Sequence, residues 1–418
     1  MAAGGGTQTE PSRRLGVAFW RLWTASSLSN LADGTLKVSL PLVAIRFTDS
    51  PMLISGLAFA LMVPWLLFAL PAGALADRLD RRRAMLGANT VRAAVAAVLA
   101  LTVLFGLGSI WVLYAAAACL GTAETIYDTS AQSMLPLMLP RDRLSRANGR
   151  LFAAELTANE FIGPPLGGFL VAAAAAVAFG TPAALWTVAL VGLLLVPGRF
   201  RVERERCATI RADVAEGLRF LWRHRLLRAL AVMVGVFNFA SNAVFGILVL
   251  YAVGPASAMR LSAPAYGALF ATVAAGSLLG SLVAERVERR LGRARSLTLT
   301  IFGNALLLGA PAVTANPFLV GAAFLVGGST NAVWNVITVS LRQRITPDRL
   351  LGRLNSAYRL VAWGTRPLGA VAGGVLAQLL GLRAVFAITA PLALALVVGM
   401  TRVTDAAMDA AEREVDER

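Results

Sequence analysis

The chain has 418 residues, of which 57% are apolar and only 15% are charged, and its mean hydropathy is +0.68. A water-soluble domain of this composition would have to cover its surface with apolar side chains, so a soluble globular protein is excluded. The formal net charge of +16 comes from arginines in short segments between apolar runs. That arrangement is typical of membrane topology and excludes nucleic acid as the expected partner.

Runs of about 20 apolar residues, enough to cross a bilayer core roughly 30 Å thick as a helix, recur along nearly the whole chain. We predict spans at residues 19–46, 52–76, 84–107, 109–134, 147–178, 181–197, 226–253, 262–285, 294–313, 316–342, 352–380 and 382–401. The predicted fold is an all-α membrane protein of twelve transmembrane helices. Its parts are an N-terminal tail (1–18), a six-helix bundle (19–197), a linker (198–225), a second six-helix bundle (226–401) and a C-terminal tail (402–418).

The first predicted span carries charge at membrane depth. Asp33 lies roughly 21 Å along the helix, near the middle of the membrane or beyond. Lys37 follows one turn later on the same face, so we expect these two side chains to pair. A carboxylate that alternates between that partner and a proton could couple protons to transport, and a static ion pair is the alternative. Asn30, one turn before Asp33, is a candidate for the wall of a cavity.

Later spans of the first half add four carboxylates, Glu124 and Asp128 in the fourth span and Glu155 and Glu160 in the fifth. A charge at membrane depth costs about 2.5–3.5 kcal/mol or more unless it is paired or hydrated, so each is a functional candidate. The second half has no carboxylate of comparable depth. We therefore expect the first half to hold the proton site. A structural role is the alternative for Glu124 and Asp128, which approach the cytoplasmic end.

Three arginines also lie within predicted spans, Arg92 in the third and Arg359 and Arg366 in the eleventh. Arg366 could balance Glu160 or Asp33, or face an anionic substrate. For Arg92 and Arg359 the alternative is that they extend to the membrane surface. Further candidates for the cavity wall are Asn238, Trp334 and Trp363, although simple packing would also explain the two tryptophans.

The basic residues are distributed on one side of the predicted topology. One set of loops includes Arg78 to Arg83 and the run from Arg199 to Arg228, whereas the alternate loops offer only Arg46, Arg260 and Arg383. Cytoplasmic loops retain Lys and Arg, so both termini are predicted to be cytoplasmic. We expect a multi-pass protein of a bacterial inner membrane. Within the linker, residues 210–227 have apolar and basic faces, which predicts a helix lying on the membrane surface.

The two halves contain matching segments. SNLADGTLKVSLPL from Ser29 pairs with FNFASNAVFGILVL from Phe237, which places Asn30 opposite Asn238. ADRLDRRR from Ala76 pairs with AERVERRL from Ala284. Both halves enter the membrane from the same side, so we predict a parallel duplication of six helices, with the substrate path between the halves.

The loop after the second span reads GALADRLDRR and resembles the G-x-x-x-D-R-x-G-R-R/K loop of the major facilitator superfamily, with Asp80 where that family commonly has Gly. The resemblance implies the major facilitator fold and a conformational latch in this loop and in its degenerate copy. The implied latch residues are Gly73, Asp77, Arg78, Asp80, Arg81, Glu285 and Arg286. The alternative for the arginines is that they only set the orientation in the membrane.

The fifth span contains GPPLGG, which is similar to the end of the G-P-x-x-G-G motif of proton-coupled drug antiporters, with Asn159 in place of an earlier Gly. The resemblance implies an antiporter-like bend. Its residues are Gly163, Pro164, Pro165, Gly167 and Gly168. Pro and Gly remove backbone hydrogen bonds and permit close packing, so a simple kink is the alternative.

Segments before the seventh span and in the eleventh resemble the branch that includes the enterobactin exporter and macrolide-efflux proteins. This resemblance implies a proton-coupled exporter of small amphipathic molecules such as antibiotics, secondary metabolites or siderophores. An uptake permease and a non-transporting scaffold or sensor are the alternatives. No catalytic motif is present, and Cys119 and Cys207 lack metal-like spacing. We therefore expect no enzyme activity, cofactor or metal, and a monomer whose partners are substrate, protons and lipid.

Overall fold

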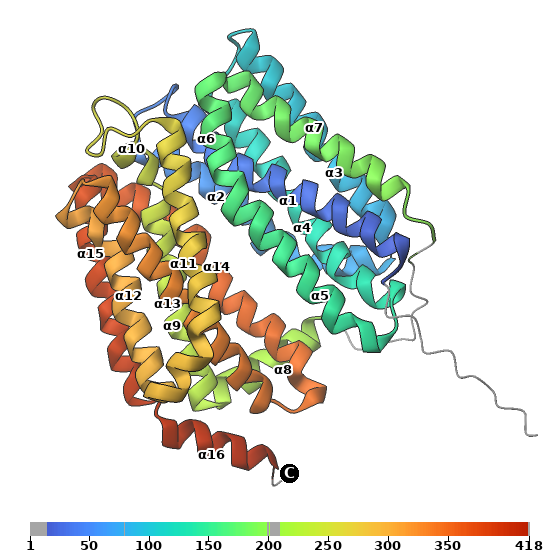
Figure 1. The fold of residues 1–418 in the computed structure, drawn as a ribbon, viewed down its shortest axis with the longest axis vertical. Helices are drawn as coiled ribbons and strands as arrows, with labels where there is room; N and C mark the ends of the chain where they lie inside the picture. The colour runs from blue at the N-terminus through green and yellow to red at the C-terminus, as the bar shows by residue number, and fades with distance from the viewer. Residues whose placement is uncertain (1–14, 79, 199, 201–209, 417–418) are drawn as a thin grey trace, which may run out of the picture.

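The computed structural model describes residues 15–78, 80–198, 200 and 210–416. Of residues 68–78, 141–142, 210–214, 348–349 and 414–416 it describes the backbone but not the side chains. In the described ranges the chain is helical apart from turns and one isolated bridge, between Val253 and Leu261. The helices form two bundles that meet beside α6 and diverge toward α5 and α8 (Figure 1).

The first bundle is formed by α1 (Gly16–Ala44), α2 (Pro51–Arg78), α3 (Arg81–Leu104), α4 (Ile110–Met138), α5 (Arg141–Glu155), the π-helix η1 (Leu156–Ile162), α6 (Gly163–Ala173) and α7 (Ala175–Leu194). Helix α8 (Ile210–Arg223) connects it to the second bundle. The second bundle is formed by α9 (Arg225–Phe245), α10 (Leu248–Ala252), α11 (Ala263–Leu291), α12 (Arg293–Val313), α13 (Pro317–Arg344), α14 (Asp348–Leu380), α15 (Leu382–Leu394) and the 3-10 helix η2 (Ala395–Thr401), followed by α16 (Asp405–Asp416).

Many polar groups at the ends and inside these helices are satisfied locally, as a bilayer favours. Ser109, Ser262 and Asn316 accept hydrogen bonds from backbone N–H groups in the first turns of α4, α11 and α13. Hydroxyls inside helices, such as those of Thr35 and Thr125, donate to the carbonyl one turn earlier. Apolar segments rich in Ala, Leu and Val can therefore stay helical while carrying hydroxyl groups.

The two bundles use the same packing pattern. In the first, α1 packs on α6, α2 on α4 and α3 on α7; in the second, α9 packs on α14, α11 on α13 and α12 on α15. Between the bundles, α2 packs on α14 and α6 on α11, which are again equivalent pairs. This arrangement is the one expected from a duplicated six-helix unit.

Nine described helices are long and apolar enough to cross a membrane, namely α3, α4, α7, α9, α11, α12, α13, α14 and α15 with η2. The other three predicted spans correspond to α1, α2 and the α5–η1–α6 segment. Charged residues interrupt α1, and the described apolar part of α2 is the shorter segment Pro51–Leu67. The all-α membrane fold is thus confirmed, and the number twelve stays a prediction.

The helices differ from the prediction most clearly at the fifth span and at the C-terminus. The fifth predicted span, 147–178, is divided into α5, η1 and α6 and ends at the extended residue Ala174, so α7 starts earlier than expected. The predicted C-terminal tail contains α16. Asp405, Asp409 and Glu412 of this helix lie against the second bundle.

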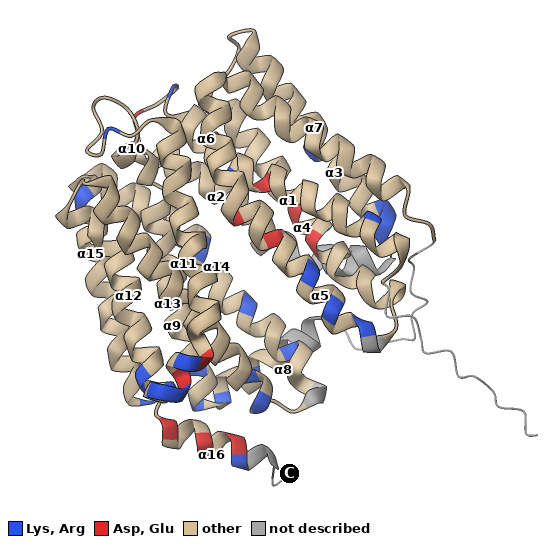
Figure 2. Cartoon of the chain, viewed as in Figure 1, with Lys and Arg blue, Asp and Glu red and all other residues tan. Residues whose placement is uncertain are grey.

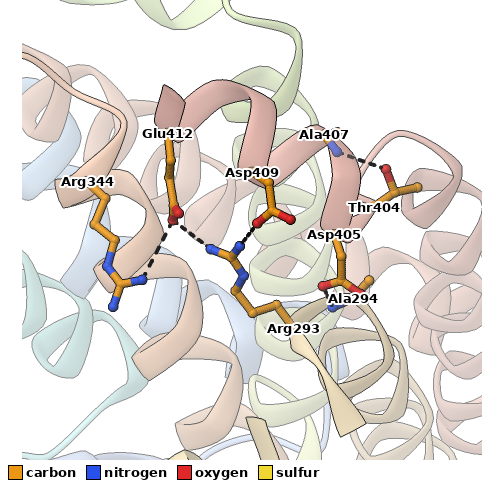
Figure 3. Close-up of polar contacts among 8 residues, drawn as sticks. All are labelled: Arg293, Ala294, Arg344, Thr404, Asp405, Ala407, Asp409 and Glu412. Carbon is orange, nitrogen blue, oxygen red and sulfur yellow. Dashed lines mark hydrogen bonds and ion pairs between the residues drawn. The ribbon is translucent and has the colours of Figure 1, made fainter. Parts of the chain in front are cut away.

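Acidic residues hold α16 against the ends of α12 and α13 (Figure 3). The Arg293 guanidinium contacts Asp409 and lies 2.6 Å from a Glu412 carboxylate oxygen, and Arg344 lies 3.7 Å from the same oxygen. Asp405 accepts a hydrogen bond of 3.0 Å from the backbone N–H of Ala294. Residue Gly292, which precedes α12, has no side chain, so Asp405 supplies this helix with the cap that it lacks.

We expect Arg293→Gln to release α16 from the bundle, because the amide keeps neither the charge nor the fork that contacts two carboxylates. Trypsin should then cut at Arg402 or Arg413 at least about tenfold faster, as followed by mass spectrometry. Arg295→Gln, which changes an exposed arginine two residues away, is the matched control. Equal cleavage rates in the two variants would show that these ion pairs do not hold the helix.

Candidate functional site

A cavity of about 480 Å³ lies between the two bundles. Most of its wall comes from α9, α12, α13, α14 and α15 of the second bundle, and Gln132, Phe152 and Glu155 of α4 and α5 close it from the first. Five predicted candidates line it, namely Asn238, Trp334, Trp363, Arg359 and Arg366, whereas Asn30 is not among its lining residues. Its size is that of a small-molecule site.

Aromatic rings and arginines form the α14 side of this cavity. The guanidinium carbons of Arg359 and Arg366 lie 4.4 Å and 4.7 Å from the centre of the Trp363 ring. Trp65 of α2 lies 5.2 Å from Trp363, and Arg359 also donates a hydrogen bond of 3.5 Å to Gln132 of α4. Arg359 is therefore held at the boundary between the bundles.

Amide side chains form much of the remaining wall. Asn304, Asn331 and Asn335 line the cavity from α12 and α13, beside the predicted Asn238. Asn238 donates to the carbonyl of Ala362 at 2.6 Å, so it also ties α9 to α14. Amides donate and accept hydrogen bonds, so the wall can bind neutral polar groups. Asn304, Asn331, Gln132 and Trp65 were not singled out from the sequence, because nothing in their local pattern distinguishes them from packing residues.

Arg92 is the centre of a buried polar cluster in the first bundle. It is fully buried and lies 3.5 Å from an Asp33 carboxylate oxygen, while the Asp33 side chain is 17% exposed. Arg92 also donates to the Ser29 hydroxyl at 3.1 Å and lies over the rings of Tyr127 and Trp186, at 5.1 Å and 5.6 Å from their centres. The cluster connects α1, α3, α4 and α7 and places a compensated charge pair inside the bundle.

The predicted pairing of Asp33 with Lys37 is wrong. Lys37 instead donates to both carboxylate oxygens of Glu160, at 2.6 Å and 2.8 Å. Glu160 lies in η1, whose π-helical turn changes the direction in which the fifth span presents its side chains. Among the described residues Arg366 has no ion-pair contact within 4 Å to Glu160 or Asp33, but its charge interacts with that of Glu160 at longer range, in line with one of the two suggested balances.

The remaining candidate carboxylates of the first bundle are Glu124, Asp128 and Glu155. Asp128 and Glu155 are exposed, Glu124 is half-buried, and Glu155 lines the cavity. Acidic segments gather midway along the first bundle, whereas basic segments concentrate toward α8 and α16 in the second (Figure 2). Asn30 is half-buried and donates to the carbonyl of Ser26, so its contacts lie within α1.

The GPPLGG segment forms the start of α6, and its glycines permit close packing of this helix at two interfaces. A methyl group at Gly163 would lie 2.7 Å from the backbone of Gly34, and one at Gly167 would lie 2.5 Å from the Thr35 carbonyl oxygen, so both glycines let α6 approach α1. A methyl group at Gly168 would lie 2.3 Å from the Ala263 carbonyl oxygen of α11. The segment is thus packed within its bundle and against the other one.

The predicted latch residues fall partly outside the described side chains. Gly73, Asp77 and Arg78 belong to the last turns of α2, where only the backbone is described. Asp80 accepts hydrogen bonds from the N–H groups of Arg83 and Phe200, and the Arg81 N–H donates to the Phe200 carbonyl, so these residues attach the loop to the segment that follows α7. Glu285 pairs with Arg289 on the same exposed face of α11. Arg286 donates to the carbonyl of Leu282, one turn earlier in α11.

No three His, Cys, Asp or Glu side chains of the described ranges lie close enough together to hold a metal ion.

Comparison with known proteins identifies a matching family and several relatives. A profile of the family described as "Transmembrane secretion effector" matches residues 12–418. The multidrug efflux pump Tap of Mycobacterium tuberculosis (strain ATCC 25618 / H37Rv) is 28% identical over 397 residues, covering 89% of each chain. The enterobactin exporter EntS of Shigella boydii serotype 4 (strain Sb227) is 26% identical over 345 residues, covering 82% of this chain and 80% of the exporter.

Solved transporters share the fold. The nucleoside transporter NupG superimposes with a TM-score of 0.73 at 13% identity, covering 92% of this chain and 98% of NupG. A bacterial homologue of the iron transporter ferroportin, in an inward-facing state, gives a TM-score of 0.70 at 16% identity and the same coverage. At these identities the likeness concerns the fold alone.

Proposed function

The chain belongs to the transmembrane secretion effector family of the major facilitator superfamily, and from that premise we propose that it is a proton-coupled exporter of small amphipathic molecules. That it is a multi-pass membrane transporter and not an enzyme follows from its family and fold. Export is supported by the relatives, which are a multidrug efflux pump and an enterobactin exporter. Proton coupling is supported by the carboxylates of the first bundle.

The proposed orientation places the arginine-rich end, with α8 and α16, in the cytoplasm of a bacterial cell. The two bundles diverge toward that end and contact each other at the opposite one, through α2 with α14 and α6 with α11 (Figure 1). In this orientation the conformation is open to the cytoplasm and closed to the outside. Export then requires the contacts at the closed end to break while the cytoplasmic ends approach, as rocking of two bundles around a central site provides.

The observation that carries the coupling proposal is the Asp33–Arg92 pair. The buried Arg92 needs a compensating charge, whereas Asp33 is partly exposed and can reach water. Protonation of Asp33 would remove its charge from the pair and leave the guanidinium to Ser29, Tyr127 and Trp186. Gain or loss of one proton would thereby change the contact between α1 and α3, and this is the kind of local electrostatic change that biases a two-state transporter.

We expect Asp33→Asn to reduce pH-driven export at least about tenfold. Everted membrane vesicles that contain the protein and have an acidic interior should accumulate at least one dye of a panel containing ethidium, Nile red and 8-anilinonaphthalene-1-sulfonate. An uncoupler should abolish that accumulation. The neutral amide cannot exchange a proton, so the variant should equilibrate dye without concentrating it. Asp49→Asn, in an exposed loop, is the matched control and should behave as the parent chain.

Three outcomes would contradict this proposal. Accumulation only in right-side-out vesicles would indicate uptake. Accumulation that does not respond to the pH gradient or to Asp33→Asn would exclude coupling through this carboxylate. Transport of no dye in either direction, with folded protein present in the membrane, would favour a scaffold or sensor on this fold.

A further inference from the structure

The three arginines of the cavity wall, Arg342, Arg359 and Arg366, differ from the two cations inside the first bundle, Arg92 and Lys37. Arg92 has Asp33 and Lys37 has Glu160 within ion-pair distance. In the described part of the chain no carboxylate lies within 4 Å of any of the three cavity arginines, although Glu155 lines the same cavity. The cavity therefore holds three cationic side chains and one acidic one among its described lining residues.

These guanidinium groups stack on aromatic rings without an ion pair within 4 Å, and one donor of Arg359 is also bonded to Gln132. Arg359 and Arg366 lie over Trp363, and the guanidinium carbon of Arg342 lies 4.2 Å from the centre of the Tyr358 ring. A guanidinium over a ring keeps its N–H donors in its own plane, free to point elsewhere. The Nε atoms of all three arginines are buried and have no hydrogen-bond partner in the structure.

Buried donors without acceptors are costly, and three of them around one cavity indicate a ligand that supplies acceptors. A planar oxyanion matches a guanidinium fork in geometry and charge. The rings of Trp363, Trp334 and Tyr358 line the same space and provide flat apolar surfaces. An ammonium group would meet three like charges at this wall.

We infer that the cavity selects amphipathic organic acids, in which a carboxylate or another planar oxyanion is bound by Arg359 and Arg366 and an aromatic body packs beside Trp363. This inference rests on the proposed export function, for which it names the charge class of the substrate. It also gives the aromatic and arginine residues of α14 one shared role. Glu155, on the opposite wall, would compete with the bound anion for Arg359.

The test is equilibrium binding to the purified full-length protein by isothermal titration calorimetry. Three probes of one shape are compared: 1-naphthoate, its neutral amide 1-naphthamide, and the cation 1-naphthylmethylammonium. We expect naphthoate to bind at least about tenfold more tightly than the other two. Arg359→Gln and Arg366→Gln should each weaken naphthoate about tenfold and leave naphthamide unchanged, because a charged hydrogen bond is lost and the apolar contacts remain.

Arg383→Gln, an exposed arginine outside the cavity, is the matched control and should change none of the three affinities. Arg366→Lys keeps the charge without the fork, so its affinity for naphthoate should lie between those of the parent chain and Arg366→Gln. This variant provides the test if Arg366→Gln folds poorly. The inference would be overturned if the amide or the ammonium bound as tightly as naphthoate, if folded glutamine variants lost affinity for all three probes equally, or if no probe bound. Binding does not depend on transport, so a failure here leaves the vesicle result on export intact, and the reverse also holds.

Discussion

Arg92→Leu is expected to abolish transport and to lower the free energy of unfolding by about 3–5 kcal/mol, the usual cost of removing one partner of a buried ion pair. The leucine would leave the carboxylate of Asp33 without its cation and the Ser29 hydroxyl without its donor. It would also remove the contacts with Tyr127 and Trp186. The loss of stability would appear as a lower thermal midpoint of the purified protein, and the loss of function as absent dye accumulation in vesicles.

A charge-neutral double variant separates the two effects. Asp33→Asn combined with Arg92→Gln removes both charges at once, so no uncompensated charge stays buried. We expect it to recover most of the thermal stability while pH-driven accumulation stays absent. If the double variant regained transport, the pair would be a structural element alone. Arg383→Leu, at an exposed position, serves as the control for loss of an arginine.

The sequence predicts which apolar helices carry the charged residues, but not how these residues pair. Asp33 and Lys37 stand four residues apart, which makes them neighbours on an ideal helix. Their actual partners come from other helices, Arg92 of α3 and Glu160 of η1. Which helices touch depends on tertiary packing, and the π-helical turn of η1 shifts the side chains that follow it in a way that periodicity does not reveal.

The all-α membrane fold was predictable for a simple physical reason. The length of an apolar segment determines whether its helix can span a bilayer, and the distribution of arginines determines its orientation. Both properties can be evaluated from the sequence alone. The cavity wall was only partly predictable, because Asn304, Asn331 and Gln132 become functional candidates only when α4, α12 and α13 place them around one space. The docking of α16 depends on Arg293, a residue that the sequence alone marks only as one of many loop arginines.

Crosslinking the two bundles at their closed end is expected to stop transport completely and reversibly. There the Ser50 hydroxyl donates a hydrogen bond of 3.3 Å to the side chain of Gln378, which joins the start of α2 to the end of α14. Alternating access requires these helix ends to separate in each cycle. With Cys119 and Cys207 replaced by Ser, Ser50→Cys and Gln378→Cys joined by a short bis-methanethiosulfonate should give inactive vesicles that regain activity on reduction. Crosslinked vesicles that transport at the normal rate would show that this contact is not a gate.

The glycines of this interface determine how strongly the closed arrangement is favoured. Gly168 lies so close to Ala263 that a methyl group there would be 2.3 Å from a carbonyl oxygen, so Gly168→Val must push α6 away from α11. Overpacking of this kind costs about 1–3 kcal/mol, which corresponds to a roughly 5- to 150-fold shift between two conformations. The yield of the crosslink between positions 50 and 378 should fall accordingly. Gly180→Val, at a glycine of α7 with open space around it, should leave the yield unchanged. A fall in the first variant alone would therefore show that the close contact of α6 with α11 sets the balance between the two faces of the transporter.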